Sequence, residues 1–124
     1  MMKYKNIQME MMLEALKPIL THRDKIGYIA ARNTRILNDT LTEYFTFKRE
    51  LISKYGTPDE DENGKEIGTI SISPTAPNFA AFVKEFDAIK DIEHNIELMT
   101  IPYEDIIGLL NGEEILKLDW MLEE

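Results

Sequence analysis

The sequence predicts an α+β fold dominated by helices, with a small antiparallel or mixed sheet. Apolar residues recur at helical spacing through most of the first 56 residues, whereas short segments of the second half alternate as strands do. The 124 residues include no cysteine, and a content of 44% hydrophobic and 30% charged residues is typical of a globular protein. We therefore expect a single domain, residues 1–124, whose core needs no disulfide.

A short strand and a first helix are expected at the N-terminus. Residues 4–7 have the character of an edge strand, and the apolar positions of residues 9–20 follow the helical period. Pro18 predicts a kink or an early helix end near Lys17, because proline removes a backbone hydrogen bond within a helix. Thr21 is the expected N-cap of the next helix, with Asp24 reaching back to it.

One long central helix is predicted over residues 24–55, and it forms a helical hairpin with the first helix. Its apolar residues follow one face, which Asn33 and Thr40 interrupt, and Gly56 is expected to end it. Such a helix would be about 45 Å long, which exceeds the diameter of a compact domain of this size. We expect a second copy to cover its apolar stripe in a homodimer, or the C-terminal helices with Trp120 to fold back over it.

The second half is expected to contain short elements. Asn63 and Gly64 form a tight-turn dipeptide. Alternation and helical spacing then predict strands over 67–73 and 95–101, a helix over 79–89 and a short helix over 103–110. Asn111 and Glu114 have the spacing of a capping box for a last helix.

Charge is spread unevenly along the chain. Residues 1–56 carry ten Lys or Arg and six Asp or Glu, a net charge of +4, whereas residues 57–124 carry four and seventeen, a net charge of −13. The total of −9 opposes binding to the phosphates of nucleic acids. No apolar run is long enough for a membrane span, and the first residues lack the apolar run of a signal peptide. We expect a cytoplasmic protein that binds neither membranes nor nucleic acid.

The densest group of acids in the sequence is the candidate partner-binding site: Asp59, Glu60, Asp61, Glu62 and Glu66. Four positions from Asp59 to Gly64 match a calcium-binding loop, but its twelfth position is Ile70, where a bidentate Glu is required. We interpret the segment as an exposed acidic turn. Basic residues on the long helix suggest a complement, in which one copy's basic helix faces another copy's acidic half: Arg32, Arg35, Lys48, Arg49 and Lys54.

Residues that could support catalysis are few. Asp87, Asp91 and His94 have the spacing of metal ligands on one helix face, but a strand beginning near Asn95 would end the helix before His94. His22 is the other histidine, and the sequence has no Gly-x-Ser-x-Gly elbow, phosphate loop or dinucleotide-binding glycine pattern. We expect no catalytic residues, no cofactor and no metal, so that the protein is not an enzyme.

Three stretches of the chain carry a family resemblance: residues 2–7 (MKYKNI), residues 50–56 (ELISKYG) followed by 59–65, and residues 118–121 (LDWM). They resemble the opening strand, the long helix with its acidic Asn-Gly turn, and the aromatic C-terminal helix of small phage- and prophage-encoded proteins of unknown function from low-GC Gram-positive bacteria. The resemblance implies a phage accessory protein expressed inside a bacterial cell. It implies no catalytic or binding residue.

Two functional hypotheses follow. In the first, a non-enzymatic phage accessory protein binds a protein partner through its acidic surface and inhibits a host or defence factor that normally binds nucleic acid. In the second, the chain is a structural or assembly component of the phage particle, and its acidic half serves solubility or self-assembly.

Overall fold

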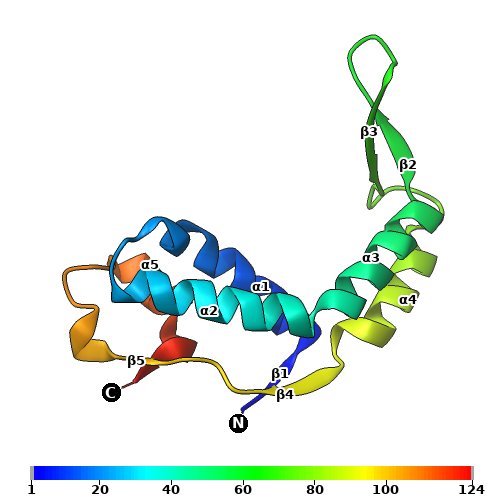
Figure 1. Ribbon diagram of the computed structural model, residues 1–124. Coiled ribbons are helices and arrows are strands. Elements are labelled where there is room, and N and C mark those ends of the chain that lie inside the picture. The colour runs from blue at the N-terminus through cyan, green and yellow to red at the C-terminus, as the bar shows by residue number, and fades with distance from the viewer. Residues whose placement is uncertain (1, 124) are drawn as a thin grey trace. The chain divides into compact units, whose positions relative to one another are not determined.

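The computed structural model describes residues 2–123 and shows a helix-dominant α+β protein, which confirms the predicted fold class (Figure 1). The chain divides into two compact units. Unit 1 combines the described residues up to Leu41 with those from Glu93 onward, and unit 2 is Thr42–Ile92. No helix within residues 2–123 is long and apolar enough to cross a membrane.

Unit 1 is built on two helices that lie side by side, α1 (Asn6–Leu16) and α2 (Lys25–Thr40) (Figure 1). α1 ends where Pro18 predicted, because the chain continues as the 3₁₀ turn η1 (Lys17–Thr21) with proline in its first turn. The helical hairpin predicted for this region is therefore present, although α1 begins earlier than expected, at Asn6, and α2 ends at Thr40, well before Tyr55.

The N-cap of α2 is Asp24 and not Thr21. The Asp24 carboxylate accepts hydrogen bonds from the amides of Ile26 and Gly27 at 3.2 and 3.4 Å. The Thr21 hydroxyl instead donates to the carbonyl of Pro18 at 3.1 Å, within η1. The prediction of Thr21 was wrong because Asp24, three residues later, is the residue that precedes the first helical turn.

Four short strands of unit 1 form two separate pairs. β1 (Met2–Lys5) pairs antiparallel with β4 (Glu93–Ile96), and β5 (Ile101–Pro102) pairs parallel with β6 (Leu122–Glu123). The strand predicted over 95–101 is thus interrupted. Asn33 supplies the reason, since its side chain accepts from the amide of Met99 at 2.7 Å and donates to the carbonyl of Met99 at 2.9 Å.

Short helical segments complete unit 1: η2 (Tyr103–Asp105), α5 (Gly112–Lys117) and η3 (Asp119–Met121). The helix predicted over 103–110 stops after one turn, and Gly108 adopts a φ of 88°, which a right-handed helix does not contain. The capping box of Asn111 and Glu114 is confirmed, with both hydrogen bonds formed at 3.0 and 2.9 Å.

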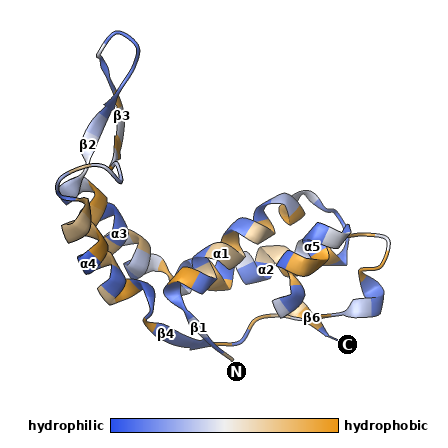
Figure 2. Ribbon diagram, turned by 180° about the vertical axis from the view of Figure 1, so that it is seen from behind, coloured by the Kyte–Doolittle hydropathy of each residue, from blue (hydrophilic) through white to orange (hydrophobic). Residues whose placement is uncertain are grey.

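The core of unit 1 is apolar and draws on both ends of the chain. Figure 2 shows hydrophobic residues along α1, α2 and α5. Its buried side chains come mainly from the helices and the segments after β4: Met9, Met12, Leu13, Leu16, Ile19, Ile26, Ile29, Ala30, Leu37, Leu41, Ile96, Ile101, Ile106, Leu110, Leu118 and Met121.

Unit 2 consists of two helices and a hairpin. α3 (Thr42–Tyr55) and α4 (Phe79–Lys90) lie side by side, and β2 (Thr57–Glu60) pairs antiparallel with β3 (Glu66–Ser71) (Figure 1). Gly56 follows the last residue of α3, as predicted, and its amide donates to the carbonyl of Ile52 at 2.6 Å. Rings along this unit stack on one another, since Phe82 lies 6.1 Å from Phe79 and 5.9 Å from Phe86 between ring centroids.

The single long helix predicted over residues 24–55 was wrong, because α2 and α3 are separated at Leu41. Leu41 leaves the helical region with a ψ of 6°, and its buried side chain belongs to the core of unit 1. Threonines flank it, and the Thr40 hydroxyl donates to the carbonyl of Ile36 at 2.8 Å, a bond that bends helices. A 30-residue stripe is therefore absent, and the homodimer stays a prediction.

Candidate interaction surfaces

The predicted acidic residues lie in the β2–β3 hairpin, whose two strands are connected by the Asn63-Gly64 turn. Asp61 shapes this turn, because its carboxylate accepts from the amides of Asn63 and Lys65 at 2.9 and 3.0 Å. Its backbone amide also donates to the carbonyl of Lys65 at 2.8 Å. One of the five predicted acids therefore has a structural role within the turn.

Asp59 stabilises the two strands of the same hairpin. Its carboxylate accepts a hydrogen bond from the Thr69 hydroxyl at 2.7 Å and another from the Ser71 hydroxyl, both across the ladder. These hydrogen bonds, from Ser71 foremost and then from Thr69, lower the pKa of Asp59 because they favour the charged form. A second predicted acid is thus held by the hairpin itself.

The remaining three acids, Glu60, Glu62 and Glu66, are exposed and have no ion pair with any described residue. Glu60 lies directly opposite Glu66 in the ladder, and like charges at such positions repel each other. Unit 2 contains six Lys or Arg and ten Asp or Glu, which gives a net charge of −4. Residues 57–71 contain one Lys and five Asp or Glu, which also gives a net charge of −4. The hairpin therefore accounts for the whole net charge of unit 2.

The hairpin also exposes apolar side chains. All six residues of β3 are exposed, with Ile67 at 57% and Ile70 at 43%. A two-stranded hairpin is marginally stable alone in water, so the contacts of its base matter. Beside this base, the Asn78 side-chain amide donates to the carbonyl of Tyr55, the last residue of α3, at 2.7 Å.

Basic residues predicted to share one helix are divided between the two units. On α3, the ammonium of Lys48 lies 5.5 Å from the ring centroid of Phe86, and Lys54 contacts Glu85 at 3.3 Å. On α2, Arg32 and Arg35 are exposed and have no ion pair or side-chain hydrogen bond with residues 2–123. The sequence did not reveal this difference, because it depends on contacts with α4.

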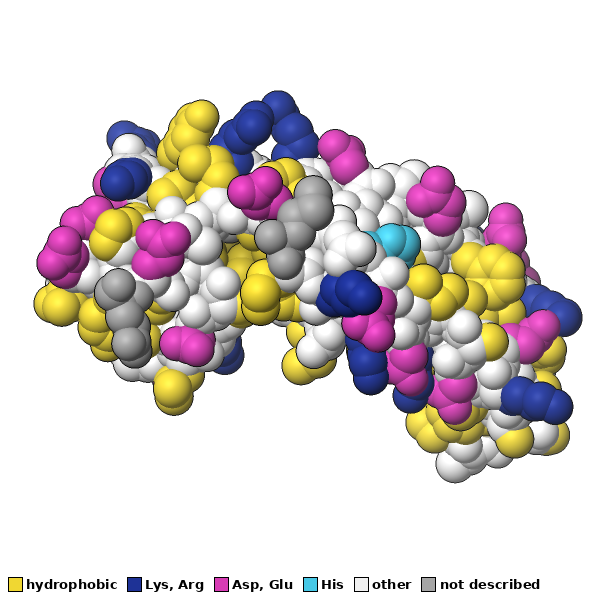
Figure 3. All heavy atoms as spheres, turned by 90° about the horizontal axis from the view of Figure 1, so that it is seen from below, with side chains coloured by type: hydrophobic (Ala, Val, Ile, Leu, Met, Phe, Trp, Pro, Cys, Tyr) yellow, Lys and Arg dark blue, Asp and Glu magenta, His cyan; other side chains and the backbone are white. Residues whose placement is uncertain are grey.

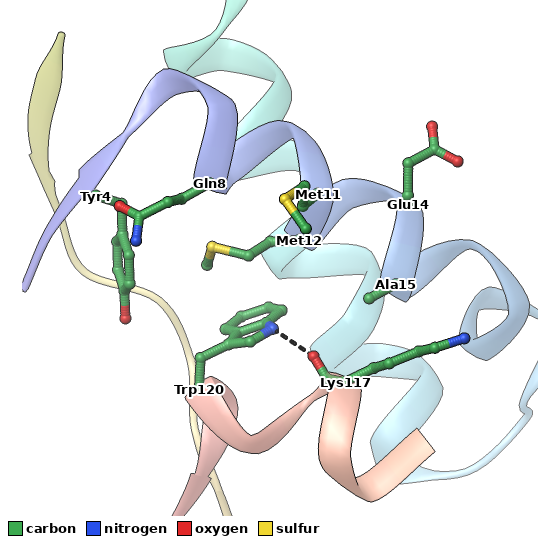
Figure 4. A pocket seen from close by; sticks show the side chains of 8 residues that line it. All are labelled: Tyr4, Gln8, Met11, Met12, Glu14, Ala15, Lys117 and Trp120. Carbon is green, nitrogen blue, oxygen red and sulfur yellow. Dashed lines mark hydrogen bonds between the residues drawn. The ribbon is translucent and has the colours of Figure 1, made fainter. Parts of the chain in front are cut away.

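A groove of about 630 Å³ in unit 1 was not anticipated from the sequence (Figure 4). α1 lines one side, and Trp120 faces it from the C-terminal segment; the lining residues are Tyr4, Gln8, Met11, Met12, Glu14, Ala15, Lys117 and Trp120. The indole N–H of Trp120 donates to the carbonyl of Lys117 at 3.0 Å, so the rest of the ring offers apolar surface. The groove can therefore accept hydrophobic side chains.

The C-terminal segment expected to cover the long helix is shared between α1 and α2. Met121 contacts Asn33 of α2 at 3.9 Å, whereas Trp120 faces α1. The surface seen in Figure 3 intersperses acidic, basic and hydrophobic side chains.

The three residues with metal-ligand spacing do not lie on one helix: Asp87, Asp91 and His94. α4 ends at Lys90, and His94 lies in β4, where it pairs with Tyr4. Asp87 instead contacts Lys90 at 3.0 Å. Within residues 2–123, no group of three or more His, Cys, Asp or Glu side chains is placed to hold a metal ion.

Comparison of the chain with protein-family models, with curated proteins and with solved structures finds no match to any of them.

Proposed function

We propose that this chain is a non-enzymatic phage accessory protein that acts inside the bacterial cell by binding a protein partner through its β2–β3 hairpin. The observation that carries the proposal is that the five acids fall into two groups, one with structural hydrogen bonds and one without. Asp59 and Asp61 hold the hairpin together, while Glu60, Glu62 and Glu66 stay exposed and unpaired within the described part of the chain.

The physical support comes from electrostatics. Because Glu60 faces Glu66 across the ladder, their repulsion destabilises the hairpin, and a cationic partner surface would relieve it. A row of exposed carboxylates can also imitate the phosphates of a nucleic acid. The partner class is therefore a protein with a basic, phosphate-binding surface, such as a host or defence factor that the chain would inhibit.

A capture experiment tests this proposal. Tagged wild type is compared, as bait in a Gram-positive bacterial lysate, with the variant Glu60→Gln, Glu62→Gln and Glu66→Gln. A matched control removes three charges elsewhere, through Glu50→Gln, Glu97→Gln and Glu104→Gln, all at exposed positions. We expect wild type and control to retain the same basic partner and the hairpin variant to lose it. Equal capture by all three proteins, or by none, would contradict the proposal.

The second candidate, an assembly component of the phage particle, is favoured by a different observation. An acidic hairpin and an unpaired basic helix face occur in one chain, which allows contacts between copies. Mass spectrometry of purified particles distinguishes the two candidates, since stoichiometric presence there favours assembly over inhibition.

A further inference from the structure

We infer that the β2–β3 hairpin of one copy binds the exposed face of α2 on a second copy. This inference rests on the proposed function, because it names a partner for the same hairpin. Its support is the complementarity, in charge and in shape, of two surfaces on this chain.

The receiving surface is one side of α2. Tyr28, Arg32 and Arg35 follow one another at i, i+4 and i+7, so they share a face of the helix. Tyr28 is 62% exposed, and the two guanidinium groups have no ion pair with the described residues. Lys25 begins the same row but already contacts Asp105 at 3.5 Å, and Asp39 ends it.

A hollow beside Arg35 adds shape to this surface. It measures about 330 Å³ and lies between η1 and α2; its lining residues are Leu20, Ala31, Thr34, Arg35, Asn38 and Asp39. Leu20 and Ala31 give it an apolar part next to the Arg35 guanidinium. The face therefore offers positive charge together with a place for a hydrophobic side chain.

The hairpin offers the opposite set of groups. Glu60, Glu62 and Glu66 provide unpaired negative charge, and Ile67 is the more exposed of its two isoleucines. The six residues of β3 span about 20 Å at 3.3 Å per residue, whereas Tyr28 to Arg35 spans about 10 Å at 1.5 Å per residue. A hairpin can thus cover the whole row, with its glutamates on the arginines.

A second copy is the occupant that the charges favour. Every copy carries one acidic hairpin and one basic α2 face, so a two-fold dimer satisfies both kinds of surface at once. Pairing Glu60, Glu62 and Glu66 with arginines would also remove the repulsion within the ladder.

Charge reversal tests the pairing. The first variant carries Glu60→Lys, Glu62→Lys and Glu66→Lys, and the second carries Arg32→Glu and Arg35→Glu. Light scattering from 1 to 100 μM should show a dimer for wild type, a dissociation constant raised at least about tenfold for each variant alone, and a dimer restored when the two variants are mixed. Circular dichroism confirms that each variant is folded.

The alternative outcomes are decisive. A wild type that keeps the single-chain mass of 14.4 kDa at every concentration, or a mixture that fails to regain the dimer, would overturn the inference. If that monomer still loses its captured partner when the three glutamates become glutamine, the proposed function stands and the second copy does not. If partner capture is also unchanged, both fail.

Discussion

Asn33 shows how a single buried polar residue connects distant parts of unit 1. Its side chain is completely buried and forms hydrogen bonds with both backbone groups of Met99. In the sequence it only interrupts an apolar face. Its role depends on a partner 66 residues away, which no local pattern reveals.

Replacing Asn33 with Ala should lower the free energy of unfolding by about 1–3 kcal/mol, because both hydrogen bonds between its buried side chain and the backbone of Met99 would be lost. Urea denaturation followed by circular dichroism measures the change. Asn95→Ala is the control, since Asn95 is exposed in β4, and it should alter stability by less than about 0.5 kcal/mol. Equal effects of the two substitutions would contradict the role given to Asn33.

The hairpin should lose order in acid because of Asp59. Its pKa in the folded protein lies below the ordinary value of 3.8, so the carboxylate stabilises the hairpin above that value. This contribution disappears as the pH falls through the lowered pKa and the carboxylate gains a proton. NMR should show the Thr69 and Ser71 amides shifting in that range for wild type, and the Asp59→Asn variant should show no such step. A step of the same size in both proteins would exclude Asp59 as its cause.

Among the elements, those set by local chemistry were predictable and those set by tertiary contacts were not. Pro18 marks the end of α1, and Asn63-Gly64 marks the hairpin turn, because each signal acts within a few residues. The break at Leu41 was missed because the side chain keeps the helical apolar pattern across it. Its burial in unit 1 separates two helices that the periodicity joined.

The start of α2 depends on a glycine. An added Cβ at Gly27 would lie 2.0 Å from the carbonyl oxygen of His22, which belongs to the backbone and cannot rotate away. Gly27→Ala should therefore destabilise the protein by at least about 2 kcal/mol in urea denaturation. Gly112→Ala makes the same change at the first residue of α5, where a Cβ meets nothing within 4 Å, and should be neutral or stabilising by up to about 1 kcal/mol. The reverse order would show that the approach of His22 is unimportant.

The whole molecule divides its buried residues unequally. Among the described residues, unit 2 buries only Tyr44 and Leu51, and α4 has no buried residue, whereas unit 1 contains the remaining core. Composition predicted one domain because it reports only the average apolar content. The five acids are visible as a group in the sequence, but only the hydrogen bonds of the hairpin separate its structural acids from its exposed ones.

This inequality predicts that unit 2 opens more easily than unit 1. Hydrogen exchange under native conditions should give lower opening free energies for the amides of α4 and the hairpin than for those of α2. A single common value for α2 and α4 would instead show that the chain unfolds as the one domain expected from the sequence.

The most direct measurement of the central claim, that the hairpin is the binding surface, is site-specific photo-crosslinking in the expressing cell. A photoreactive amino acid replaces Glu62 in one protein and the exposed Glu104 of unit 1 in another. We predict a covalent adduct from position 62, lost when Glu60→Gln and Glu66→Gln are added, and none from position 104. The mass of the adduct identifies its partner as a second copy or another protein. An adduct that forms equally at both positions, or that survives the loss of the glutamates, would contradict the claim.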